Sequence, residues 1–253
     1  MKVGSMNDPS KPLMDEVRLF KSFGLDYVEL TVEAPEATPE KVERYLDELS
    51  EAGLPFVGHM PWFFQITSPY GRVREAFILE AVRVLDAAAR LKMPYVTVHP
   101  DFLKLKRRTE DIISLTVDSL SRLSAEASDR GVKLCFENFE REHISADELQ
   151  KIFDALPDLW FTLDVGHAFM GAGNIEHIRQ LIGRFKGRLL NVHMHDNFGV
   201  KDDHLPLGAG RLDYQSVVRE LKAAGYGGNM TLEIHSTDRD YIRISREKLL
   251  KIL

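Results

Sequence analysis

The chain has a single cysteine, Cys135, among its 253 residues, so it cannot form an intrachain disulfide. This scarcity is typical of proteins from reducing compartments. No run of about 18 apolar residues occurs, which argues against a membrane-spanning helix. The N-terminal segment MKVGSMNDPSKP also lacks the apolar stretch of a signal peptide. These absences predict a soluble, cytoplasmic protein with no membrane partner.

Basic residues are in the minority. Lys and Arg number 33 against 39 Asp and Glu, which gives a net charge of −6. A protein that binds nucleic acid mainly through its phosphates is usually basic, so the charge argues against that role. Hydrophobic residues make up 44% of the chain and charged residues 28%, as is ordinary for a globular protein that buries a core.

Short β-branched runs alternate with longer amphipathic patterns along the whole sequence. Eight such units in 253 residues average about 32 residues each, the size of a strand–helix repeat. This pattern predicts a (β/α)8 TIM barrel in the α/β class, with residues 1–253 as one domain. An open doubly wound sheet is the rival, but it would place a Gly-rich phosphate loop where GSMNDPSKP stands. The expected strands are 2–5, 26–32, 55–60, 95–100, 132–138, 160–167, 188–196 and 229–235, and the expected helices are 13–23, 39–52, 70–91, 109–130, 145–156, 175–185, 213–224 and 239–253.

Six consecutive strands are expected to end in a metal-ligating residue type. Catalytic residues of such barrels lie at the carboxyl ends of the strands, where these side chains meet. Glu137 and Asp164 end otherwise apolar strands, and converging buried carboxylates would repel one another without a cation. A metal site is therefore expected at this rim. The strand-end residues are His59, His99, Glu137, Asp164, the pair His193 and His195, and the pair Glu233 and His235; His167, Asp202 and His204 follow in the loops as candidate further ligands.

Three weaker features have more than one interpretation. The run KLKRR, residues 104–108, is either a solvated loop or a loop that grips a phosphate. The adjacent aromatics Trp62, Phe63 and Phe64 either wall a pocket or bury in a subunit contact. Cys135 lies two residues before Glu137 and so faces the barrel interior, where we expect a buried, inert thiol.

The chain resembles the xylose isomerase-like barrel superfamily, which includes sugar-phosphate isomerases and epimerases and the endonuclease IV enzymes. The resemblance rests on GHMPW, VTVHPD, CFEN, LDVGH, HMHDN, DDHLPLGAGRLD and LEI, in the family's order. It implies one metal ion held by four strand-end residues: Glu137, Asp164, His193 and Glu233. His193 matches the ligand better than His195 because the family's histidine stands three residues before an acidic residue, here Asp196.

In the epimerases of this superfamily, the two ligand glutamates also serve as the acid/base pair. The resemblance therefore implies that Glu137 and Glu233 are catalytic. They would exchange a proton next to the metal-polarised carbonyl of an open-chain sugar or sugar phosphate. His167, Arg141 and Glu142 would orient the substrate. The expected cofactor is Mn²⁺ or Zn²⁺, with Mg²⁺ and Co²⁺ as alternatives. The sequence does not define the oligomeric state and is compatible with a homo-oligomer.

The alternative is an endonuclease IV-like, zinc-dependent hydrolase of abasic DNA. Those enzymes hold three zinc ions with the same four ligands and with His59, His99, His167, Asp202 and His204, and all nine residue types occur here. The surrounding sequence departs from the nuclease pattern, because NFERE follows Glu137 and Pro-Asp follows His99. These departures favour an isomerase with one tightly held ion. A third reading, a catalytically silent metal-binding barrel, is disfavoured by the complete ligand set.

Overall fold

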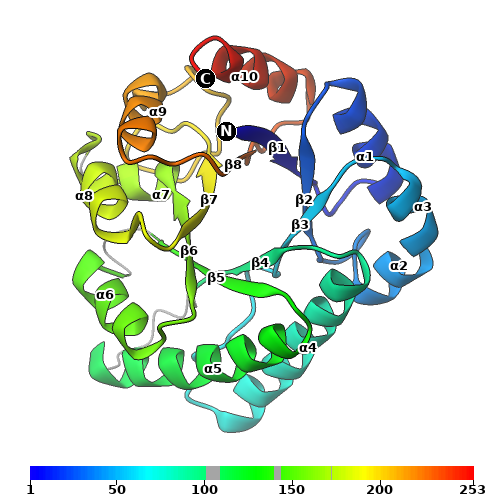
Figure 1. Ribbon diagram of the computed structural model, residues 1–253, viewed down its shortest axis with the longest axis vertical. Coiled ribbons are helices and arrows are strands. Elements are labelled where there is room, and N and C mark those ends of the chain that lie inside the picture. Colours follow the sequence, from blue (N-terminus) through cyan, green and yellow to red (C-terminus); the bar gives the residue numbers. More distant parts are fainter. Residues whose placement is uncertain (101–108, 140–143, 172) are drawn as a thin grey trace.

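Eight parallel strands pair in sequence order and close into a barrel, because β8 also pairs with β1 (Figure 1). The structure, a computed structural model, describes residues 1–100, 109–139, 144–171 and 173–253. The predicted (β/α)8 barrel is confirmed. Its strands are β1 (Lys2–Met6), β2 (Tyr27–Thr31), β3 (Phe56–His59), β4 (Tyr95–Val98), β5 (Lys133–Glu137), β6 (Trp160–Asp164), β7 (Leu189–Met194) and β8 (Asn229–Leu232).

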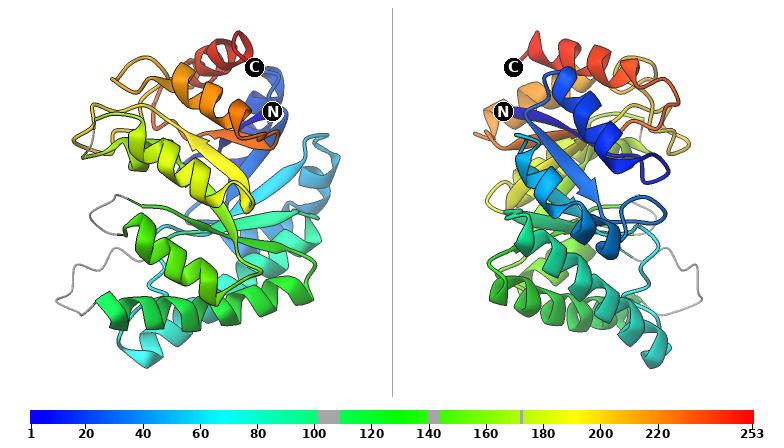
Figure 2. Two further views of the ribbon diagram at one scale, coloured as in Figure 1. Left: turned by 60° about the vertical axis from the view of Figure 1, so that its left-hand side comes forward. Right: turned by 90° about the vertical axis from the view of Figure 1, so that its right-hand side faces the viewer.

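The helices pack along the outside of the strands (Figure 2). Local signals fix several of their ends. Thr38 caps the helix that begins at Pro39, and Ser145 forms a capping box with Glu148. Among the described helices, none is long and apolar enough to cross a membrane. The helices are α1 (Leu13–Ser22), α2 (Pro39–Arg44), α3 (Leu46–Glu51), α4 (Gly71–Arg90), α5 (Thr109–Asp129), α6 (Ala146–Ala155), α7 (Val165–Phe169), α8 (Glu176–Phe185), α9 (Tyr214–Ala223) and α10 (Asp240–Leu250).

Two expected elements are wrong in detail. The single helix expected over 39–52 is two helices, because the backbone of Tyr45 leaves the helical region between α2 and α3. The strand expected over 160–167 ends at Asp164, where the chain turns at once into α7. The Asp164 side chain accepts a hydrogen bond from the backbone N–H of His167 at 2.6 Å and so starts this short helix.

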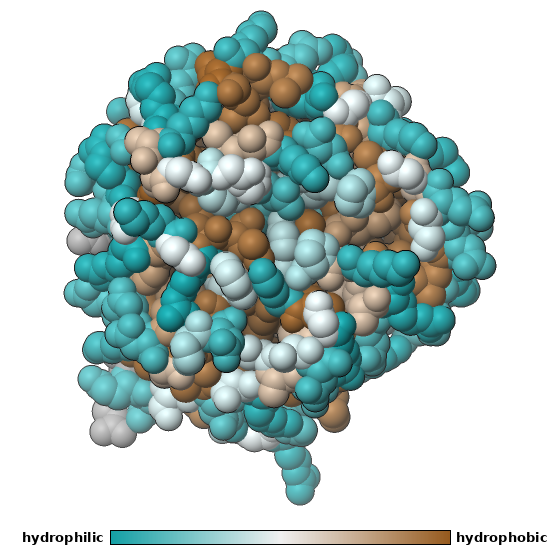
Figure 3. Space-filling model, in the orientation of Figure 1, coloured by the Kyte–Doolittle hydropathy of each residue, from teal (hydrophilic) through white to brown (hydrophobic). Residues whose placement is uncertain are grey.

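Apolar side chains fill the space between the barrel and its helices, and a smaller cluster closes one end of the barrel. That cluster contains Tyr27, Val57, Tyr95 and Cys135. Cys135 is buried, as expected, and burial raises the pKa of its thiol, which disfavours the reactive thiolate. On the face drawn in Figure 3, hydrophilic residues dominate the periphery and apolar side chains show mainly toward the middle.

The other part of the barrel interior is polar. Thr97 on β4 and Thr162 on β6 share a hydrogen bond of 2.8 Å between their hydroxyl oxygens. Because β4 and β6 are not neighbours in the sheet, this bond crosses the interior. Thr231 on β8 likewise donates across the interior to Glu29 on β2. The interior therefore changes from apolar to polar along the barrel axis.

Candidate metal centre and active site

Four buried side chains converge around one imidazole nitrogen at the carboxyl ends of the last four strands. Glu137 and Asp164 are the final residues of β5 and β6, His193 lies in β7, and Glu233 directly follows β8. The His193 Nδ1 atom lies 3.1 Å from Glu233 Oε2, 3.4 Å from Glu137 Oε2 and 3.8 Å from Asp164 Oδ2. The barrel thus brings together the four residues that the family resemblance implies as metal ligands.

The unpartnered atoms of this group fit a divalent cation. Both carboxylate oxygens of Glu137, Glu233 Oε2 and His193 Nδ1 are buried and have no hydrogen-bond partner. Buried polar atoms are normally paired, and several buried carboxylates in contact repel one another. Carboxylate oxygen and imidazole nitrogen are donors that Zn²⁺ and Mn²⁺ accept. The residues therefore have the chemistry of a metal centre.

A second group of ligand type shares Glu137. The Nε2 atoms of His59 and His99 each lie 3.5 Å from Glu137 Oε2 and 3.1 Å from each other. His59 is the last residue of β3, and His99 follows β4 by one residue. These three residues offer donor atoms within 4.8 Å of one another. Glu137 thus lies between two candidate metal positions.

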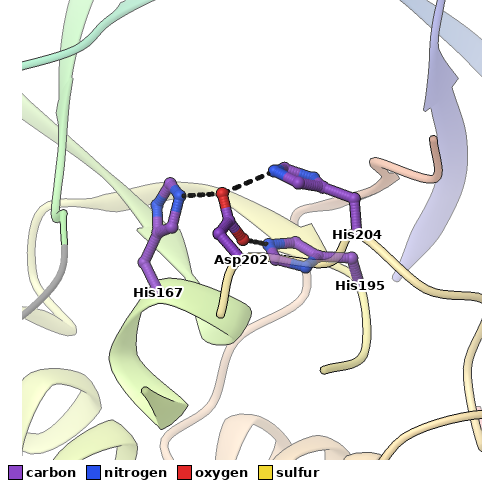
Figure 4. A group of neighbouring side chains, drawn as sticks. All are labelled: His167, His195, Asp202 and His204. Atoms are coloured by element: carbon purple, nitrogen blue, oxygen red, sulfur yellow. Dashed lines mark hydrogen bonds and ion pairs between the residues drawn. The ribbon is translucent and has the colours of Figure 1, made fainter. Parts of the chain in front are cut away.

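A third group surrounds Asp202, whose carboxylate lies between three imidazoles (Figure 4). Its Oδ2 is 3.1 Å from His167 Nε2 and 2.7 Å from His204 Nε2, and its Oδ1 is 3.7 Å from His195 Nε2. The rings of His195, His204 and His235 stack in sequence at centroid distances of 4.0 Å. The structure therefore places Asp202, His167 and His204 in a ligand group beside the first one.

Glycine is required where α7 passes this group. A Cβ atom on Gly166 would lie 2.0 Å from the His195 ring, too close for any side chain. His195 also hydrogen-bonds to both Asp164 oxygens, at 3.1 and 3.2 Å. His193 in β7 therefore contacts Glu137 and Glu233, whereas His195, which follows β7, connects Asp164 to the third group.

Charges within the cluster depend on one another. Burial disfavours the charged form of Glu137, yet the charges of His99 and His193 hold its pKa well below its usual range. Burial also opposes protonation of His204, but neighbouring carboxylates raise its pKa to about 9. Burial lowers the pKa of His99 to about 4. At an imidazole that is protonated near neutral pH, such as His204, a cation would have to displace the proton.

Sequence reasoning used Asp196 only as a marker and missed its structural role. This buried carboxylate accepts hydrogen bonds from four backbone N–H groups of the loop after β7. Oδ1 accepts from Asn197 at 2.8 Å and Leu212 at 2.9 Å, and Oδ2 accepts from Gly208 at 2.8 Å and Gly210 at 3.0 Å. The loop held in this way carries Asp202 and His204 into the third group.

Replacing Asp196 by asparagine should lower the free energy of unfolding by about 2–5 kcal/mol, because the amide nitrogen leaves two buried N–H donors without an acceptor. Urea denaturation measures this loss. Asp213→Asn is the matched control. It changes the exposed N-cap of α9, where asparagine caps a helix about as well as aspartate does. The free energy of unfolding is therefore expected to change by no more than about 0.5 kcal/mol. Equal stability of the two variants would contradict the role of Asp196.

Two more buried residues were missed. Asn138 joins β5 to β6, accepting from the Asp164 N–H at 2.8 Å and donating to the Asp164 carbonyl at 2.9 Å. Glu29 is a fully buried carboxylate on β2 that contacts His193. A charged residue inside the strand YVELT was its only signal in the sequence. The candidate residues Arg141 and Glu142 and the run 104–108 lie outside the described residues.

A pocket of about 610 Å³ opens above these groups. That volume suits a small molecule. Trp62 lines the pocket and is 54% exposed, whereas Phe64 is half-buried against the core beside Phe77. Trp62 therefore forms part of the pocket wall, which was one of the two interpretations of the aromatic run. The other lining residues include polar side chains at or after the carboxyl ends of several strands: Asn7, Asp8, Glu33, His59, His99, His167, Asp202, His204, Glu233, His235 and Arg239.

Comparisons with known proteins agree with this architecture. MJ1311, an uncharacterized protein of Methanocaldococcus jannaschii, is 28% identical over 239 residues, covering 90% of this chain and 80% of that protein. A probable endonuclease 4 of Mycobacterium leprae is 26% identical over 213 residues, covering 80% of this chain and 82% of that protein.

Solved structures show the same fold. A D-tagatose 3-epimerase-like protein matches with a TM-score of 0.89 at 24% identity, covering 100% of this chain and 97% of its own. The IOLI protein with a bound zinc atom matches with a TM-score of 0.83 at 20% identity, covering 100% and 98%. The sequence profile described as "Xylose isomerase-like TIM barrel" matches residues 17–252. This chain therefore belongs to the xylose isomerase-like TIM barrel family.

Proposed function

We propose that this protein is a metal-dependent isomerase or epimerase of a sugar or sugar phosphate. The observation that carries the proposal is a pair of glutamates beside His193, of which Glu233 lines the pocket and Glu137 is buried. The Oε2 atoms of Glu137 and Glu233 lie 3.4 and 3.1 Å from His193 Nδ1, and both oxygens are buried without a hydrogen-bond partner. Two carboxylates so placed can both hold a cation and exchange protons with one small substrate.

Each glutamate has a separate part in the proton transfer. A divalent cation held by Glu137, Asp164, His193 and Glu233 supplies Lewis-acid polarisation of a carbonyl when it is bound. Glu233 lines the pocket and takes the proton from the carbon next to the carbonyl. Glu137 first takes up a proton from solvent and returns it to that carbon, on the opposite face in an epimerisation, while Glu233 releases its own proton to solvent. His167 lies 3.4 Å from Glu137, lines the pocket and orients a substrate hydroxyl.

The pocket wall supports a polyhydroxylated substrate. Asn7, Asp8 and Glu33 line the side formed by the loops after β1 and β2. Amide and carboxylate groups pair with hydroxyls, and an aromatic face such as Trp62 suits the C–H face of a sugar. The similarity to a D-tagatose 3-epimerase-like structure supports the same class.

The second candidate is a zinc-dependent hydrolase of abasic DNA. The three ligand groups around Glu137, His193 and Asp202 favour it, since several adjacent metal ions suit phosphodiester hydrolysis. The similarity to a probable endonuclease 4 points the same way. Against it, Asp8 and Glu33 line the pocket and would repel a polyanion.

Hydrogen exchange separates the two functions. In heavy water, the metal-loaded protein is expected to introduce deuterium next to the carbonyl of one member of a ketose and ketose phosphate panel. Elemental analysis of the same sample is expected to show one tightly held ion. Three tightly held zinc ions with cleavage of an abasic-site duplex, weakening steeply as salt rises, and no exchange would establish the hydrolase instead. Metal binding with neither reaction would leave a silent metal-binding barrel.

A further inference from the structure

Glu29 is a buried carboxylate that the proposed reaction does not use. It lies at the centre of β2 and is inaccessible to solvent. Three side chains of β7 and β8 donate hydrogen bonds to it across the barrel interior. Asn191 Nδ2 lies 2.9 Å from Glu29 Oε2, His193 Nε2 lies 3.0 Å from Glu29 Oε1, and the Thr231 hydroxyl donates to Glu29 Oε2. Because Thr231 donates there, its oxygen accepts the hydrogen bond from the Tyr27 hydroxyl.

The two nitrogens of His193 thus have different surroundings. Nε2 faces Glu29, while Nδ1 faces the carboxylates of Glu137, Asp164 and Glu233. A carboxylate accepts hydrogen bonds and donates none when ionised, so the Nε2 atom must carry a proton to satisfy this contact. The Nδ1 atom then presents its lone pair to a cation.

This arrangement explains why a charged group stands in the barrel interior. Burying a carboxylate costs several kcal/mol unless donors compensate for the lost water, and an apolar residue would avoid that cost. The matching interior pair Thr97 and Thr162 uses only neutral hydroxyls. A carboxylate behind the ligand histidine fixes the orientation of the ring and increases the basicity of the nitrogen that meets the metal.

We infer that Glu29 is a positioning residue for the metal centre, which accepts the Nε2–H of His193 and thereby directs its Nδ1 atom at the bound cation. Tyr27, Thr231 and Asn191 hold the carboxylate in place. The inference rests on the metal site of the proposed function but not on its substrate, so either hydrolase or isomerase chemistry leaves it intact.

Zinc affinity tests this role directly. Competition with a chromogenic chelator is expected to show that Glu29→Gln weakens Zn²⁺ binding by about 10–100-fold. Thr97→Val is the matched control, since it removes a buried interior hydrogen bond on β4 without touching the Glu29 network. Its affinity is expected to stay within about twofold of the unmodified protein, because separate sites act independently.

Nitrogen-15 NMR of the zinc-loaded, unmodified protein provides a readout that does not depend on either variant folding. The His193 ring is expected to show a slowly exchanging Nε2–H and a metal-bound Nδ1. A His193 ring protonated at Nδ1 would overturn the inference. It would also be overturned if Glu29→Gln bound Zn²⁺ as tightly as the unmodified protein, or if Glu29→Gln and Thr97→Val weakened Zn²⁺ binding equally. If the unmodified protein binds no divalent ion, the proposed metal site itself is wrong as well. Zinc binding without any sugar exchange would contradict only the proposed function.

Discussion

Replacing Glu137 or Glu233 by glutamine is expected to lower turnover of a confirmed ketose substrate by about 10³-fold or more, because each change removes a proton acceptor and an anionic ligand. Both side chains are buried at the strand ends, where barrel residues serve chemistry more than stability. The barrel should therefore stay folded, as circular dichroism can show. Loss of deuterium exchange in parallel with loss of product would place the defect at the proton-transfer step.

Glu75→Gln provides the control for this experiment. It makes the same chemical change on the outer surface, where Glu75 pairs with Arg122, so turnover should stay unchanged. Metal content measured on each variant separates the two roles of the glutamates. A variant that keeps its metal but loses turnover has lost acid/base chemistry, and one that loses its metal has lost a ligand. A near-normal rate in either variant would refute the acid/base role of that residue.

Metal removal should destabilise the folded protein strongly. A cation present at about 1,000 times its dissociation constant stabilises the folded state by about 4 kcal/mol. For a chain of this length, that gain corresponds to a rise of about 8–16 °C in the melting temperature. Calorimetry of chelator-treated protein, with and without added Zn²⁺ or Mn²⁺, measures the difference. Asp164→Asn should abolish most of the gain, and an unchanged melting temperature in the unmodified protein would argue against the site.

The stabilisation by metal should grow as pH rises. Burial opposes protonation of the ligand His193, but neighbouring carboxylates hold its pKa well above the usual range, so this ring carries an extra proton at pH 6 in the metal-free protein. A cation must displace such protons from the imidazole nitrogens, and affinity therefore falls on acidification. The rise in melting temperature on adding metal is expected to be larger at pH 8 than at pH 6. A difference of the opposite sign would contradict the imidazole ligands.

Periodicity was enough to predict the barrel because each strand–helix unit is a local pattern. Alternating β-branched runs and amphipathic segments indicate the elements, and parallel strands connected by helices leave one arrangement for their carboxyl ends. Glu137 and Asp164 could therefore be placed on the same rim from their positions alone. The structure brings both to His193 as that argument requires.

Contacts between distant segments could not be predicted in the same way. Glu29 meets His193 across 164 positions of the chain, and nothing near Glu29 in the sequence indicates that partner. The break at Tyr45 has no local proline or glycine to signal it. The α2 residues Glu40 and Glu43 pair with Arg83 and Arg90 of α4, so tertiary contacts orient this helix. Asp164 as the cap of α7 was locally visible, but the apolar run before it favoured a longer strand.

The two tryptophans of the chain lie at opposite ends of the barrel and so provide a built-in optical signal. Trp62 lines the mouth of the pocket and packs edge-on against Phe63, with ring centroids 5.9 Å apart. Trp160 begins β6 at the far end, under the Lys133 ammonium group at 4.1 Å. In a Trp160→Phe variant the remaining tryptophan fluorescence comes from Trp62 alone. Quenching or a blue shift of that emission then follows ligand entry in real time, without a label and without a known product.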